Sequence, residues 1–246
     1  MTYCLAVKVN EGVALLSDTR TNAGLDDISR FRKMFVWERA GERALVLLAA
    51  GNLGVTQGVI THLESAIDAA TRGDTAESIL TCPTLYRAAE LVGEAMQAAQ
   101  ERDRARIEAS GASADASIIL AGQRSDGEMR LFLIYCAGNF IEATEDTPFF
   151  QIGEHKYGKP ILDRVINPRT SLTDALKAAM ISMDSTMRSN LGVGMPLDLA
   201  VIRSERFGIV ETRRFESDDP VFRAISESWS RELREAFHAL PDVPLG

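Results

Sequence analysis

The order of strand-like and helix-like segments constrains the fold of this chain more than any other feature. Strand-like segments come first, and two helices, a second block of strands, a helix, a pair of strands and a last helix follow. This is not the regular strand–helix alternation of a doubly wound parallel fold. Two antiparallel sheets packed together, with helices outside them, satisfy the order better. The sequence therefore predicts one α+β domain spanning residues 1–246.

The segments themselves are recognised by their apolar periodicity. The segment over residues 43–50 is almost continuously apolar, as expected of a strand that is buried on both faces. Ser171 or Thr173 could cap the helix that follows them. The predicted strands cover residues 3–9, 13–16, 33–38, 43–50, 116–122, 129–135, 140–144, 149–152, 197–202 and 208–214. The predicted helices cover residues 55–70, 85–108, 171–187 and 219–238, and residues 19–32 are predicted to form a polar loop.

The start of the chain has the residues of a reactive site. Thr2 directly follows Met1, and a short loop, Asn10-Glu11-Gly12, separates the first two strands. If these strands pair across a three-residue loop, paired residue numbers sum to about 22, which places Asp18 opposite Cys4 and diagonal to Thr2. Removal of Met1 would leave Thr2 as the N-terminus beside a carboxylate. Such a threonine has a hydroxyl nucleophile and its own amine as general base.

Two further residues fit the same chemistry. A buried Lys33 paired with Asp18 would keep its charge, and that charge would lower the pKa of a nearby amine. Gly51 comes just before a helix, where free backbone N–H groups can stabilise an oxyanion. Taken singly, these residues could be a structural carboxylate, a surface lysine and a strand-to-helix turn. Their occurrence together favours a catalytic site.

Composition excludes several classes of function. The net charge of −8 makes nucleic acid and anionic membranes unsuitable partners. The three cysteines are an odd number without CxxC spacing, so we expect a reducing cytoplasm. No signal peptide and no apolar run of roughly 18 residues is recognisable. The three histidines, His62, His155 and His238, lack ligand spacing, so we expect neither a metal nor an organic cofactor.

The motifs around these residues resemble the proteasome β-subunit family of N-terminal-nucleophile hydrolases. The resemblance rests on Thr2, the Ser17-Asp18-Thr19-Arg20 box, Lys33 and the Ala49-Ala50-Gly51-Asn52 turn. The start Met-Thr-Tyr-Cys-Leu-Ala, the run over residues 19–24 and Arg32-Lys33-Met34 are most similar to the bacterial ancestral β-subunits within that family. The resemblance covers the whole chain and implies a four-layer αββα sandwich of two antiparallel sheets.

The resemblance also implies a role for each of five residues. Thr2 is expected to be the nucleophile and, through its freed amine, the base. Asp18 is expected to orient Lys33 and offset its charge, and Lys33 to tune the amine and the hydroxyl. The Gly51 N–H is expected to bind the oxyanion. Asp184, in Met183-Asp184-Ser185, is similar to the aspartate that the family places beside the nucleophile.

Two departures from the family pattern weaken the expected activity. The Gly-Ser-Gly turn near the nucleophile is replaced by Gly153-Glu154-His155, and Met187 stands where a serine usually follows the aspartate. We expect a homo-oligomer, a ring or an open helical assembly, that cleaves amide bonds in peptides or proteins. The alternatives are a weakly active or inactive scaffold and a small-molecule amidase. The mass of the intact protein, which shows whether Met1 is present, discriminates between the hydrolase and the scaffold.

Overall fold

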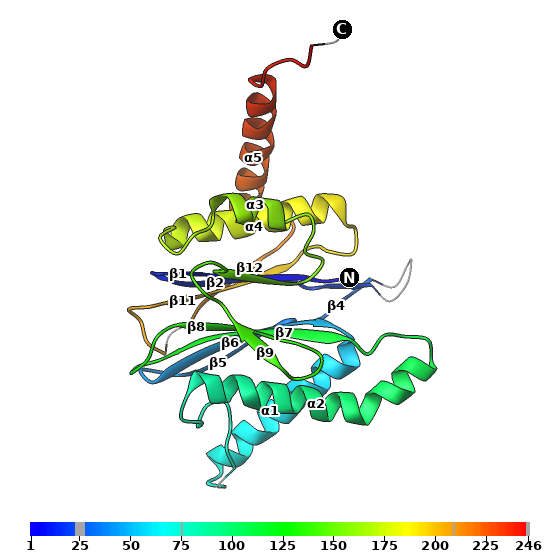
Figure 1. The fold of residues 1–246 in the computed structure, drawn as a ribbon, viewed down its shortest axis with the longest axis vertical. Helices are drawn as coiled ribbons and strands as arrows, with labels where there is room; N and C mark the ends of the chain where they lie inside the picture. The colour runs from blue at the N-terminus through cyan, green and yellow to red at the C-terminus, as the bar shows by residue number, and fades with distance from the viewer. Residues whose placement is uncertain (23–27, 75, 209, 245–246) are drawn as a thin grey trace.

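Two five-stranded antiparallel sheets lie face to face, with a layer of helices outside each. The computed structural model describes residues 1–22, 28–74, 76–208 and 210–244. From top to bottom, the layers in Figure 1 are α3 with α4, the sheet containing β1 and β2, the sheet containing β6 and β7, and α1 with α2. This four-layer αββα sandwich confirms the predicted fold class.

The strand orders of the sheets determine which residues meet at the chain start. The first sheet has the order β10 (Phe149–Gly153), β1 (Tyr3–Val9), β2 (Gly12–Asp18), β11 (Leu197–Arg203) and β12 (Val210–Phe215). The second has the order β5 (Met34–Arg39), β6 (Arg43–Gly51), β7 (Ala116–Arg124), β8 (Arg130–Ile134) and β9 (Phe140–Glu142). The helices are α1 (Leu53–Thr71), α2 (Leu85–Ala109), α3 (Lys159–Val165), α4 (Leu172–Ser189) and α5 (Pro220–His238).

The predicted strands and helices are present in the described residues, with ends that differ by at most two residues. Ser171 caps α4 by accepting a hydrogen bond from Asp174 N, which settles the choice of cap. The prediction of a loop over residues 19–32 was wrong at both ends, where β3 (Arg20–Asn22) pairs with β4 (Ile28–Arg30). The middle of that loop, residues 23–27, lies outside the described residues. The short helix α3 was not predicted because seven residues hold too little periodicity.

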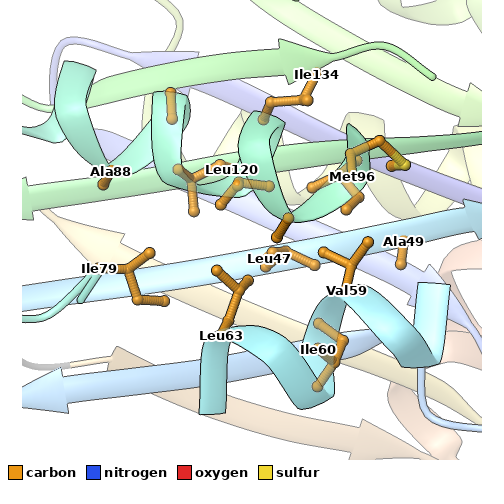
Figure 2. Close-up of a cluster of buried hydrophobic side chains, with 14 of the residues drawn as sticks. Leu47, Ala49, Val59, Ile60, Leu63, Ile79, Ala88, Met96, Leu120 and Ile134 are labelled. Atoms are coloured by element: carbon orange, nitrogen blue, oxygen red, sulfur yellow. The ribbon is translucent and has the colours of Figure 1, made fainter. Parts of the chain in front are cut away.

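Three apolar cores separate the four layers. One lies between the sheets and includes Cys4, Leu15 and Leu48. A second lies between the first sheet and α3 with α4. Figure 2 shows the third, in which Leu47 and Leu120 of the second sheet meet Val59 of α1 and Met96 of α2. β6 is buried on both faces because it contributes to two of these cores, as its continuous apolar sequence predicts.

The helix α5 stands apart from the sandwich. Asp219 caps its start, and Phe222 packs against Phe215 of β12. From there α5 extends away from the α3–α4 layer (Figure 1). Leu233 and Phe237, towards its end, are 53% and 69% exposed. The apolar face of α5 is therefore buried at the start of the helix and exposed to solvent towards its end.

Candidate active site

The chain start lies between β2 and β10 at one end of the first sheet. Tyr3 N–H donates to Asp18 Oδ1 at 3.1 Å. The expected register was wrong by one residue, since Cys4 pairs with Ser17 and not with Asp18. The cause is the turn: Val9 pairs directly with Gly12, so the loop has two residues instead of three. Gly12 belongs to β2, where a side chain would collide with the Ile202 carbonyl of β11.

Asp18 and Lys33 form a buried ion pair beside this chain start. Lys33 Nζ donates to Asp18 Oδ1 at 2.7 Å and to Arg20 O at 2.6 Å. The side chains are 6% and 0% exposed, respectively. Gly194 N–H donates to Asp18 Oδ2 at 3.3 Å, so the carboxylate accepts from one ammonium and two backbone amides. Burial raises the pKa of Asp18, and the Lys33 charge and the two amides oppose that rise.

Gly51, at the end of β6, has the backbone conformation and the free donor that an oxyanion site needs. Its φ is +109°, and an added Cβ would lie 2.7 Å from Ala116 Cα, so only glycine fits there. Ala49 N–H donates to Lys33 O, whereas Asn52 N–H donates to Asp115 O. Strand alternation therefore points the Gly51 N–H to the Lys33 side, beyond Met34, the first residue of β5. No described residue accepts a hydrogen bond from it.

One cleft brings Thr2, Lys33 and Gly51 together. Its volume is ≈ 640 Å³. Besides these three it is lined by Met1, Thr21, Arg32, Phe35, Ala49, Ala50, Asn52, Leu53, Thr56, Gln57, Ala112 and Gly153. Thr2 is half-buried, and its nitrogen lies in the peptide bond to Met1. The cleft is lined by a residue with a hydroxyl, by a lysine that is paired with a buried carboxylate, and by a glycine whose N–H has no described acceptor, a combination that suits acyl transfer once the amine is free.

Asp184, the fifth expected site residue, has a different environment. Its carboxylate accepts from Arg188 Nε at 2.9 Å and from Ser226 Oγ at 2.7 Å. Arg188 also donates to Ser226, so the three side chains join α4 to α5. Within the described ranges, no hydrogen bond links Asp184 to Thr2, Asp18 or Lys33. These contacts are those of an anchor for α5.

Sequence reasoning did not assign roles to two polar residues close to the chain start. Glu154 N–H donates to Thr2 O at 2.7 Å, and Glu154 Oε2 accepts from Asn190 Nδ2 at 3.1 Å. An added Cβ on Gly192, two residues after Asn190, would lie 2.7 Å from Met1 Cβ. The only sequence signals were the glycines of these two loops. His155 is exposed, and Met187 packs in the core under α4 where the family has serine.

Two other reactive groups near the site are unsuited to catalysis. The Tyr3 hydroxyl is hydrogen-bonded to Ser182 Oγ at 2.6 Å, and burial raises the pKa of Tyr3 to about 12. Cys4 is fully buried, and burial raises the pKa of its thiol. Cys136, by contrast, is partly exposed and lies 3.8 Å from Asp115 Oδ1. None of the three cysteines lines the cleft that contains Thr2.

The described residues contain no group of three or more His, Cys, Asp or Glu placed to hold a metal ion. Among the described helices, none combines the length and the apolar character that a membrane crossing requires.

Comparisons with known proteins agree with this geometry. The family model described as "Proteasome subunit" matches residues 2–202. Among curated proteins, none matches. Among solved structures, the Anbu (Gly-1) mutant from Hyphomicrobium sp. strain MC1 is 42% identical with a TM-score of 0.90, and 100% of each chain is covered.

Two further structures are similar over nearly the full length of both chains. Anbu (ancestral beta-subunit) from Yersinia bercovieri is 42% identical with a TM-score of 0.90, covering 99% of each chain. A structure described as the helical assembly of the Anbu complex from Pseudomonas aeruginosa is 43% identical with a TM-score of 0.91, covering 98% of each chain. The chain therefore belongs to the proteasome subunit family and, within it, to the Anbu, or ancestral β-subunit, group.

Proposed function

We propose that this chain is a threonine-type hydrolase that cleaves amide bonds in peptides or proteins, with Thr2 as nucleophile after removal of Met1. One observation carries the proposal. Thr2, Gly51 and Lys33 line one cleft, Lys33 is paired with the buried Asp18, and no described residue accepts a hydrogen bond from the Gly51 N–H.

The mechanism follows from these positions. The freed Thr2 amine takes the hydroxyl proton, and Oγ1 attacks the carbonyl carbon of the substrate. The Gly51 N–H donates to the oxyanion of the tetrahedral intermediate. The ammonium returns the proton to the leaving amine as the C–N bond breaks, leaving an ester on Thr2. The amine then takes a proton from water, whose oxygen attacks the ester and releases the acid and the Thr2 hydroxyl.

The ion pair serves this mechanism through charge. The Lys33 ammonium lowers the pKa of a nearby amine and favours the anionic form of the attacking oxygen. Asp18 compensates the Lys33 charge at 2.7 Å, because an unpaired buried charge is unfavourable. Asp18 is thus a positioning residue, and Lys33 acts on the reacting atoms.

Met1 determines whether the site is active. A peptide nitrogen is not a base, so a chain that keeps Met1 has no general base at Thr2. Met1 is 60% exposed, which makes it accessible to an aminopeptidase. The experiment is incubation of the Met1-free protein with a threonine-directed epoxyketone or β-lactone. We expect added mass on the N-terminal peptide, and labelling that persists in Thr2→Ala would exclude Thr2 as the nucleophile.

We also propose that the chain assembles with copies of itself in an open, spiral or lock-washer arrangement. The Pseudomonas aeruginosa protein is described as a helical assembly. The exposed apolar side chains of α5 support association, because such a stripe is favourably buried against a partner. Light scattering should give a mass far above 26.9 kDa, and micrographs should show short helical stacks. A monodisperse species of chain mass would exclude assembly, and a closed ring would exclude the open form.

A second candidate is a self-assembling scaffold with little turnover. One observation favours it: the positions where the family has serine hold Glu154 and Met187. Assembly without labelling of Met1-free protein would support this candidate over the hydrolase. For either function we propose the bacterial cytoplasm as the compartment, since the three cysteines are unpaired.

A further inference from the structure

Glu154 is a buried acidic side chain that the proposed mechanism does not use. It is 9% exposed. Its carboxylate accepts from Lys156 N at 3.2 Å and from Asn190 Nδ2 at 3.1 Å, both neutral donors. In the described part of the chain, no lysine, arginine or histidine nitrogen forms an ion pair with it. A buried carboxylate without a paired cation is unfavourable, so a positive charge placed beside it would be stabilised.

Glu154 lies directly across from the residue that becomes the N-terminus. Tyr3 pairs with Gly153 in the ladder of β1 and β10, and Glu154 N–H continues that ladder by donating to Thr2 O. Gly153 has a φ of +81°, and this turn brings the Glu154 side chain to Asn190 at the end of α4. Thr2 and Glu154 therefore face each other just beyond the ends of β1 and β10, where the chain of Glu154 has already turned into a loop.

Met1 packs against the loop whose Asn190 holds this carboxylate. An added Cβ on Gly192 would lie 2.7 Å from Met1 Cβ and 3.1 Å from Asn190 Oδ1. Met1 and Asn190 thus both contact Gly192, and Asn190 holds Glu154. Removal of Met1 vacates the space beside Gly192 and creates a positive charge on the nitrogen of Thr2, the residue whose carbonyl accepts from Glu154 N–H.

We infer that Glu154, anchored by Asn190, is the counter-charge that binds the Thr2 ammonium after Met1 is removed. Glu154 is a positioning residue: it fixes the amine and raises the pH at which that amine becomes a base. The inference rests on the proposed processing at Thr2. Glu154 stands where the family has the serine of a Gly-Ser-Gly turn, so the inference gives this departure from the family pattern a role in binding the amine.

The charges around the Thr2 amine set the sign of the effect. Lys33 would lower the amine pKa, but Asp18 offsets its charge at 2.7 Å. Arg32 lines the cleft and is exposed, and His155 is exposed next to Glu154. Solvent screens the electrostatic effect of both side chains on the amine. Arg20, which donates to Leu191 O, is a third cation near this loop. The Glu154 carboxylate opposes the lowering by these cations, so the amine pKa should be higher with Glu154 than with a neutral residue in its place.

The test measures the amine pKa without relying on turnover. Met1-free full-length protein is released from a ubiquitin fusion, and its N-terminal amine is carbamylated with cyanate across a pH series. The mass of the N-terminal peptide gives the rate, and its pH dependence gives the pKa. We expect the pKa to fall by about one pH unit in Glu154→Gln. The matched control is Glu145→Gln, an exposed glutamate in the loop before β10, for which no change is expected.

A second readout separates this inference from the proposed function. Labelling of Thr2 by a β-lactone should begin at lower pH in Glu154→Gln than in the unsubstituted protein. No labelling at any pH, with the cyanate result as expected, would overturn the hydrolase and leave the counter-charge in place. An unchanged amine pKa in folded Glu154→Gln would overturn the counter-charge. If that variant does not fold, Asn190→Ala, which removes the anchor of the Glu154 carboxylate, takes its place, and an unchanged amine pKa there overturns the counter-charge.

Discussion

Replacement of Lys33 by methionine tests the buried ion pair on which the site depends. Methionine has a similar length and keeps the apolar contacts of the lysine stem. It leaves the Asp18 carboxylate fully buried, with only the Tyr3 and Gly194 amides as donors. Removing one partner of a buried pair costs about 3–5 kcal/mol because an uncompensated charge remains. We therefore expect the free energy of unfolding to fall by that amount at pH 8.

The pH dependence of this loss has a definite sign. Burial already raises the pKa of Asp18, and removing the Lys33 charge raises it further. A carboxyl whose folded pKa exceeds its unfolded value of about 3.9 binds its proton more tightly when folded. The resulting stability is fully present below about pH 3.9 and is lost as the pH rises through the folded pKa. Lys33→Met should thus approach the unsubstituted protein in acid and fall away from it towards pH 8.

Urea unfolding at pH 4.5 and pH 8 measures this difference. The double variant Lys33→Met/Asp18→Asn removes both charges and should recover most of the loss at pH 8. Lys177→Met is the matched control, since Lys177 is 57% exposed in its ion pair with Asp174. An equal cost at both pH values, or a cost below about 1 kcal/mol at pH 8, would refute the buried-charge reasoning. Labelling of Thr2 in folded Lys33→Met should fall by several orders of magnitude.

Three further predictions concern other parts of the molecule. Gly51→Ala should abolish Thr2 labelling and lower the melting temperature, because the new Cβ meets Ala116; unchanged labelling would exclude Gly51 as oxyanion donor. Asp184→Asn should leave labelling rates unchanged within about twofold, whereas a large loss would return Asp184 to the site. The double variant Leu233→Glu/Phe237→Glu should reduce the assembly mass measured by light scattering while the circular dichroism spectrum stays normal. The control Arg234→Ala should leave that mass unchanged. An unchanged mass in the double variant would show that α5 does not take part in assembly.

The fold was predictable because its signals are local. The continuous apolar run of β6 and the helical stripe of α4 are each visible within one segment. The register of the β1–β2 hairpin was not predictable, because Gly12 reads as a turn residue in the sequence although it belongs to β2. Its actual role is to let the Ile202 backbone of β11 approach, a contact between segments far apart in the chain.

The candidate site was predictable to the same degree. Asp18 ends β2 and Lys33 directly precedes β5, so each could be placed from its own segment. The resemblance to the family motif predicted that the two form a pair. The pairing of Glu154 with Asn190 depends on β10 adding to β1 and on the end of α4 reaching the same edge. No pattern in either segment indicates the other. Asp184 was assigned by resemblance, whereas its partner Ser226 belongs to α5, which only the structure brings alongside.

The different environments of two cysteines make the chain suitable for site-selective fluorescence. Cys4 is inaccessible between the sheets, whereas Cys136 is partly exposed beside Asp115, whose carbonyl accepts from Asn52 next to Gly51. A maleimide dye should therefore attach at Cys136 without prior cysteine replacement. That dye would sit behind the oxyanion turn without touching the threonine. Its emission would report occupancy of the cleft in real time, even for ligands that are bound and never cleaved.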